Sequence, residues 1–125
     1  MLKGNAELAS QVIGAAIDVH KALGPGLLES AYHQCLAHEF SLRNIGFQSE
    51  VPLPVAYKGI SLACGYRIDF VVENQIVLEL KSVEALQGIH EAQILTYLRL
   101  AKKNHGFLIN FNVRVLKQGI KSFVF

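Results

Sequence analysis

The sequence lacks the features that mark several specialised protein classes. Its two cysteines, Cys35 and Cys64, show no CxxC or histidine-paired spacing, so we expect no zinc site and interpret both as core residues. No apolar run is long enough to cross a bilayer, and the first residues carry no signal-peptide pattern. Unpaired thiols without an export signal predict a cytoplasmic protein with no membrane partner.

Strong charge is also missing. The formal net charge is +2, and the basic residues are scattered without forming an arm that would by itself indicate a nucleic-acid binder. About half of the residues, 51%, are apolar, which is enough for one hydrophobic core. We therefore expect residues 1–125 to form a single globular domain.

Apolar periodicity predicts three helices, at residues 6–23, 27–44 and 86–103. Gly24 and Gly46 end the first two. The expected buried face of the second helix is Leu28, Ala31, Tyr32, Cys35, Leu36 and Leu42, and that of the third is Ile89, Ala92, Leu95, Leu98 and Ala101.

The other segments alternate as strands do. We expect strands at residues 47–57, 60–63, 66–72, 76–82 and 106–111, and a closing hairpin from 113–116 and 120–125. Pro52 and Pro54 assign the first strand to a sheet edge or a bulge. The order of elements predicts an α/β fold with a mixed central sheet of four or five strands flanked by helices.

The most informative segment is the hairpin of residues 66–72 and 76–81. If its loop is residues 73–75, Val72 faces Ile76, so Asp69 faces Glu79 and Arg67 faces Lys81. A two-residue loop would instead mix charged and core residues on one face, which burial should forbid. Ile68, Phe70 and Val72 then share the opposite, apolar face.

Two carboxylates this close repel each other unless they are exposed, protonated, paired with a lysine or holding a cation. Oxygen ligands of this kind suit Mg²⁺ or Mn²⁺. An alternative from the same residues is a solvated hairpin face with cross-strand ion pairs, and Asp69, Glu79 and Lys81 alone leave it open.

Three motifs resemble those of a known superfamily. Asp69 followed by Glu79-Leu80-Lys81 resembles the core of the PD-(D/E)xK nuclease superfamily, although Ile68 replaces its proline. Gly26-Leu27-Leu28-Glu29-Ser30-Ala31-Tyr32 matches the GxxExxY motif of a family placed in that superfamily. Gln93 and Tyr97 resemble the QxxxY motif of its RecB-like branch, and their spacing puts both on one helix face.

The resemblance implies a role for each matching residue. Glu29, Asp69, Glu79 and the Leu80 carbonyl would hold Mg²⁺ or Mn²⁺. Lys81, Glu79, Asp69 and Gln93 would be catalytic. Tyr97, His90 and Tyr32 would contact substrate, although packing is the more ordinary role for Tyr32. His20, His33 and His38 are expected to be structural or exposed.

The leading interpretation is a divalent-metal-dependent nuclease acting on nucleic acid, with DNA as the expected substrate. The alternative is a non-catalytic nucleic-acid- or protein-binding module on the same fold. A third is a metal-stabilised homo-oligomer that pairs through the exposed apolar strand at residues 122–125.

Overall fold

The computed structural model describes residues 5–125, which form an α/β fold with one main sheet and helices on both of its faces. The elements, in order, are α1 (Asn5–Leu23), α2 (Glu29–Leu42), β1 (Phe47–Pro52), β2 (Val55–Tyr57), β3 (Ile60–Leu62), β4 (Arg67–Val72), β5 (Ile76–Lys81), α3 (Gly88–Ala101), β6 (His105–Asn110), the 3₁₀ helix η1 (Leu116–Gly119) and β7 (Ile120–Val124). No helix within residues 5–125 is both long and apolar enough to span a bilayer.

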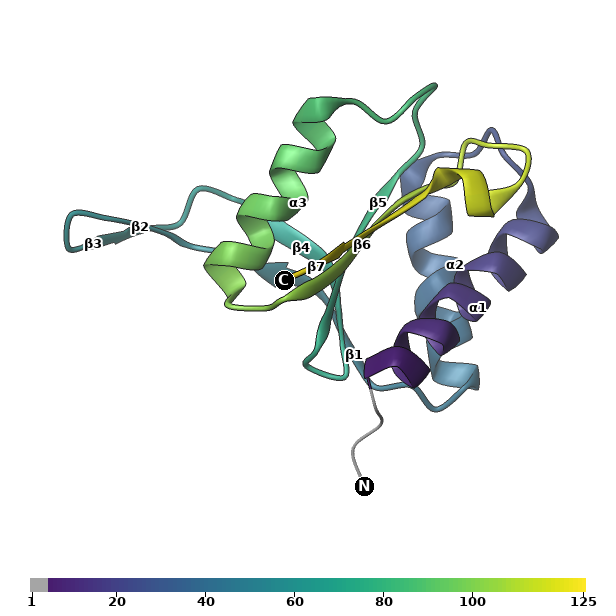
Figure 1. Cartoon of the computed structure of the whole chain (residues 1–125), viewed down its shortest axis with the longest axis horizontal. Coiled ribbons are helices and arrows are strands. Elements are labelled where there is room, and N and C mark those ends of the chain that lie inside the picture. The colour runs from purple at the N-terminus through teal and green to yellow at the C-terminus, as the bar shows by residue number, and fades with distance from the viewer. Residues whose placement is uncertain (1–4) are drawn as a thin grey trace.

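The main sheet has five strands in the order β1-β4-β5-β6-β7, in agreement with the predicted mixed sheet. Strands β5 and β6 are parallel, and the other neighbouring pairs are antiparallel. Helices α1 and α2 cover one face, and α3 covers the other, where it connects β5 to β6 (Figure 1). The core is accordingly divided into two clusters, one on each side of the sheet.

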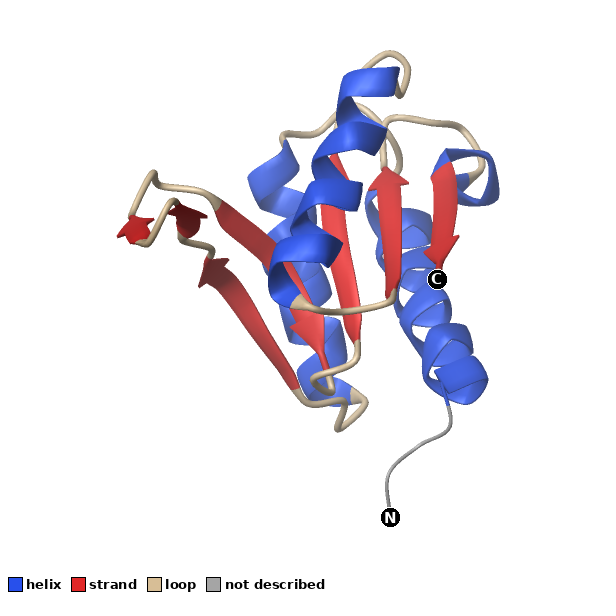
Figure 2. Ribbon diagram, turned by 60° about the vertical axis from the view of Figure 1, so that its left-hand side comes forward, coloured by secondary structure: helices blue, strands red, loops and turns tan. Residues whose placement is uncertain are grey.

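The predicted first strand is interrupted. It divides into β1, which is an edge strand of the main sheet, and β2, which pairs with β3 in a separate two-stranded arm. Leu53 and Pro54 separate the two strands. The arm projects from the body of the molecule (Figure 2). The two prolines thus predicted the edge position, but not the change of sheet.

The parity of the β4–β5 hairpin is confirmed. Val72 pairs with Ile76 and Phe70 with Leu78, so the loop is residues 73–75. Glu73 and Asn74 occupy the left-handed region, with φ of 49° and 55°. The predicted apolar face breaks at one point: Phe70 packs in the cluster under α1 and α2, whereas Ile68 packs in the cluster under α3.

Two predicted helix faces are wrong in part, although Tyr32 and Leu36 of α2 and Leu98 of α3 are buried as expected. The buried residues of α2 are Tyr32, Leu36 and Phe40, whereas Leu28 and Leu42 are exposed. Cys35 and Cys64 are exposed, so neither is a core residue. The buried residues of α3 are Ile94, Tyr97 and Leu98, whereas Ile89, Ala92 and Leu95 face solvent. Most residues of these helices are apolar or small, so several alternative stripes fit a helical period equally well.

The predicted closing hairpin does not form, although its second strand, expected at residues 120–125, is present as β7. Residues 113–115 form bends, η1 follows, and β7 pairs with β6. Val113 and Leu116 pack in the core beside α1 and do not form a strand. Gly119 lies so close to Asn110 that a Cβ at this position would stand 2.2 Å from the Asn110 carbonyl oxygen. That contact fixes the turn into β7.

Candidate active site

The sheet opens at the predicted acidic residues. The ladder between β4 and β5 ends at Phe70 and Leu78, while β4 continues beside β1 to Arg67 and β5 continues beside β6 to Lys81. The expected pairing of Arg67 with Lys81 therefore does not form. The two strands diverge from Asp69 and Glu79 onward and enclose a fork in the sheet.

Side chains replace the ladder at this fork. The Asp69 backbone N–H donates to Oε1 of Glu79 at 3.0 Å, and the Leu80 N–H donates to Oδ2 of Asp69 at 2.7 Å. Each carboxylate thus accepts a bond from the other strand, which fixes its orientation. Since the N–H and C=O of one strand residue point the same way, the Leu80 carbonyl is expected to point into the fork as well.

The surroundings of the Asp69 and Glu79 carboxyl groups raise the pKa values of both. Burial and the neighbouring Asp69 raise the pKa of Glu79 to about 8, and only 3% of Glu79 is exposed. Burial also raises the pKa of Asp69, against the bond from Leu80 and the charges of His33 and Lys81. At neutral pH without a cation, the pair therefore holds a proton that two solvated acids would have lost.

Glu29 stands at the start of α2, where its carboxyl interacts electrostatically with Asp69 and Lys81. Partial burial of its carboxyl raises the pKa of Glu29, and Asp69 adds to that rise while Lys81 and His33 oppose it. Glu29, His33, Glu50 and Asp69 line one open cavity of about 690 Å³ on the α2 side of the sheet.

The Gly26–Tyr32 motif positions Glu29. Tyr32 is fully buried; its hydroxyl donates to the Gly24 carbonyl at 2.7 Å and accepts from the Leu27 N–H at 3.1 Å. Gly26, with φ of 94°, allows the turn between these contacts. Because both hydrogen-bonding functions of Tyr32 are used inside the protein, the expected substrate contact is corrected to a structural role.

Further anchors hold the loops beside the fork. Ser82 Oγ donates to the Leu27 carbonyl at 2.6 Å, and the Gly26 N–H donates to Oδ1 of Asn112 at 3.1 Å. The buried Asn110 side chain donates to the Val83 carbonyl at 2.9 Å and accepts from the Val83 N–H at 3.1 Å. Sequence reasoning missed these anchors, because their partners are distant in the chain.

Sequence reasoning also did not identify His33 as a residue that lies beside the acidic side chains. It lies one turn after Glu29 on α2 and stacks on Phe70 with ring centroids 4.3 Å apart. The i,i+4 spacing from Glu29 was the available signal. The other two histidines fit the expectation: His20 bonds to the Val113 carbonyl at 2.7 Å, and His38 is exposed.

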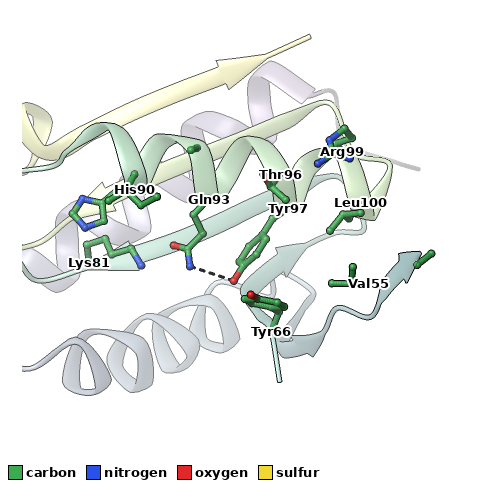
Figure 3. Close-up of a pocket in the computed structure, with 12 residues that line it drawn as sticks. Val55, Tyr66, Lys81, His90, Gln93, Thr96, Tyr97, Arg99 and Leu100 are labelled. Atoms are coloured by element: carbon green, nitrogen blue, oxygen red, sulfur yellow. Dashed lines mark hydrogen bonds between the residues drawn. The ribbon is translucent and has the colours of Figure 1, made fainter. Parts of the chain in front are cut away.

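The α3 side of the fork contains the remaining predicted residues. Lys81, His90, Gln93 and Tyr97 line a second cavity (Figure 3). The Gln93 amide donates to the Tyr97 hydroxyl at 3.2 Å. Burial and the Glu79 charge raise the pKa of Tyr97. His90 accepts a bond from the Gln87 N–H at 2.9 Å through Nδ1, so one of its nitrogens closes the α3 N-terminus.

The ion-pair alternative does not fit this arrangement. Glu79 is buried, not solvated, and the ion pairs found within residues 5–125 join Arg43 to Asp18 and Glu39 and Lys121 to Glu91. The expected three-acid cage is not formed either. In the part of the chain that the structure describes, no three His, Cys, Asp or Glu side chains are grouped so that they could hold a metal ion.

The oxygen donors that do converge fit a magnesium-like cation. Asp69 and Glu79 are linked through each other's strands, and the Leu80 carbonyl is the backbone oxygen that we expect to point into the fork. Mg²⁺ keeps several waters and is commonly held by one or two carboxylates, so a third acid in direct contact is not required. Glu29 would then act through water.

Comparison with known proteins identifies a family for nearly the whole chain. The family model described as the PD-(D/E)XK nuclease superfamily matches residues 6–123. The matched segment extends from α1 to β7 and so includes the entire fork. Comparisons with curated proteins and with solved structures give no match.

Proposed function

The chain belongs to the PD-(D/E)XK nuclease superfamily, and we propose that it is a divalent-metal-dependent nuclease that hydrolyses nucleic-acid phosphodiester bonds, with DNA as its substrate. The observation that carries the proposal is the buried carboxylate pair at the fork, with Lys81 beside it. A bound Mg²⁺ or Mn²⁺ would neutralise charge on the phosphate and make water a better nucleophile at neutral pH.

Each residue of the fork has a separate proposed role. Asp69, Glu79 and the Leu80 carbonyl would hold the cation, and Glu29 would assist them through water. The two backbone N–H groups that bond the carboxylates keep them oriented, so less reorganisation is needed when the cation enters. Glu79 would have to lose its proton to serve as a ligand, because a ligand carboxylate must be ionised.

Lys81 is the proposed catalytic lysine, which acts through its positively charged ammonium group. It lies at the end of β5, half-buried, in the electrostatic field of Asp69, Glu79 and Glu29. From there its ammonium stabilises negative charge that develops on the phosphate and helps orient the attacking water. Gln93 and Tyr97, which share the cavity with Lys81, position the nucleic-acid backbone against it.

A cleavage panel tests the proposal. Single- and double-stranded DNA and RNA are incubated with Mg²⁺, Mn²⁺ or EDTA and the wild-type protein. Lys81→Ala should lower turnover by orders of magnitude while DNA affinity changes little. The matched control is Lys103→Ala, because Lys103 bonds to Asn74 at the β4–β5 turn, away from the fork. Equal cleavage by wild type and Lys81→Ala would assign the activity to a contaminant and overturn the proposal.

One observation favours a second candidate. Burial raises the pKa values of Glu79 and Asp69, so without a cation the pair holds a proton, and a non-catalytic nucleic-acid-binding module is compatible with the same fork. Retention of DNA with no cleavage under any metal would support that function.

A further inference from the structure

The cavity on the α3 side of the fork is shaped by an element that the nuclease chemistry does not require. Its volume is about 600 Å³, within the usual range of small-ligand sites. Helix α3 forms one wall with Gln93 and Tyr97, and the chain around the β2–β3 arm forms the other with Val55, Ala56 and Tyr66 (Figure 3). The arm therefore closes a space that the main sheet and α3 would leave open.

The lining combines apolar walls with aromatic rings. The Tyr66 and Tyr97 rings meet edge to face, with centroids 6.4 Å apart and planes at 64°. Tyr66 is half-exposed, so part of its ring is open to an incoming group, whereas Tyr97 is buried. The Gln93 amide, bonded to the Tyr97 hydroxyl, adds polar donor and acceptor atoms. An apolar space with an open aromatic ring and one amide suits a flat heteroaromatic ring.

The charges at the cavity fit a polyanion that carries such rings. Lys81 and Arg99 are among the lining residues, and Figure 3 shows them toward opposite ends of the row, with the two tyrosines between. A nucleotide chain has this composition: phosphates alternate with planar bases. The cavity also adjoins the fork, because Lys81 lines the cavity and interacts electrostatically with Asp69 and Glu79.

We propose that this cavity binds one unpaired nucleobase next to the phosphate at the fork, so that the substrate is a single-stranded segment of nucleic acid. The inference rests on the proposed function for the position of that phosphate. A base inside a duplex stacks on its neighbours and cannot present its face to Tyr66 unless it is first extruded, at a cost of a few kcal/mol. Single strands present this face without that cost.

Binding to a designed oligonucleotide tests the inference without any cleavage. The probe is a fluorescent six-nucleotide DNA backbone of abasic sites with a single thymine at its centre, and the reference is the same backbone fully abasic. Because the backbone can shift along the protein until its single thymine reaches the cavity, the test does not depend on which nucleotide position lies at the fork. In EDTA, the wild type should bind the probe about 5- to 150-fold more tightly than the reference, as expected for one base on one aromatic ring.

Four variants locate the effect. The quantity compared is the ratio of the affinity for the probe to the affinity for the abasic reference. Tyr66→Ala should bring this affinity ratio close to one, and Tyr66→Phe, which keeps the ring, should preserve it. Ala92→Trp adds bulk to an exposed cavity-lining position and should also abolish the ratio. The matched control is Tyr57→Ala, because Tyr57 is an exposed arm tyrosine that does not line the cavity. A melting curve for each variant confirms that it is folded.

The outcomes separate this inference from the proposed function. A ratio of one in the wild type, or a ratio unchanged in folded Tyr66→Ala and Ala92→Trp, overturns the base-binding site even if the protein cleaves DNA. A ratio lost in both variants supports the site even if no cleavage is found. Blunt duplex bound as tightly as a single strand of equal length overturns the single-strand preference. The same probe with a ribose backbone shows whether RNA is accepted as well.

Discussion

The Glu79 carboxyl offers the most direct quantitative test of the fork. It is 3% exposed, and burial together with Asp69 raises its pKa from 4.5 to about 8. In the metal-free protein, Glu79 therefore binds a proton in the native state over a pH range in which the unfolded chain has released it. By linkage, the contribution of Glu79 to the free energy of unfolding is largest below pH 4.5 and falls as pH rises toward 8.

The magnitude follows from the two pKa values. One pKa unit corresponds to about 1.4 kcal/mol, so Glu79 alone lowers the stability by up to about 5 kcal/mol between pH 4.5 and pH 8.5. That is a large part of the 5–15 kcal/mol that typically holds a domain together. Asp69 and Glu29, whose pKa values are also raised, act in the same direction.

Glu79→Gln isolates the effect. Glutamine resembles the protonated acid and keeps an oxygen that can accept the Asp69 N–H bond. In EDTA, we expect the variant to be several kcal/mol more stable than the wild type at pH 8.5, and the two to converge near pH 4.5. Urea denaturation at half-unit pH steps measures the difference. Glu84→Gln, at an exposed carboxylate, is the control and should show no pH-dependent gain.

Parallel pH profiles for wild type and Glu79→Gln would refute this reasoning. They would mean that water or a rearrangement relieves the buried charge in the native state. Adding Mg²⁺ at pH 8.5 provides a second check, because a cation at the fork should stabilise the wild type and leave Glu79→Gln nearly unchanged.

Three further predictions address the metal, the motif and the turn. With a dissociation constant of about 1 mM, 10 mM Mg²⁺ should add about 1.4 kcal/mol and raise the melting temperature by about 5 °C; Asp69→Asn should lose most of this rise, and K⁺ at matched ionic strength should not produce it. Tyr32→Phe should cost about 1–3 kcal/mol in urea denaturation, because the Gly24 carbonyl and the Leu27 N–H lose their partner, whereas Tyr57→Phe at an exposed site should cost little. Gly119→Ala should cost at least about 2 kcal/mol, since its Cβ would stand 2.2 Å from a backbone oxygen. In contrast, Gly88→Ala has nothing within 4 Å and should be neutral or stabilising. A small effect at Gly119 would show that the turn into β7 is free to shift.

Local patterns predicted the hairpin well and the helix faces poorly. The loop at residues 73–75 could be derived because a one-residue slip would move every apolar side chain of β5 to the wrong face. No such penalty applied to α3, where Ile89, Ile94, Leu95 and Leu98 offer more than one apolar stripe. The stripe that is buried was selected by contact with Val71, Val77 and Leu108 on the sheet, which local periodicity does not contain.

The sequence by itself determined the parity of the β4–β5 hairpin, which leads to Asp69 and Glu79 one residue beyond the paired Phe70 and Leu78, and the motif spacing that placed Glu29 at a helix start. Only the tertiary structure decided that β4 and β5 separate at these two residues, because β1 and β6 hold the diverging ends. It also decided that Asn110, Asn112 and Ser82 anchor the neighbouring loops and that the arm closes a cavity beside Lys81. Alternation and helical period are local properties of a chain, whereas these features depend on contacts between segments far apart in sequence.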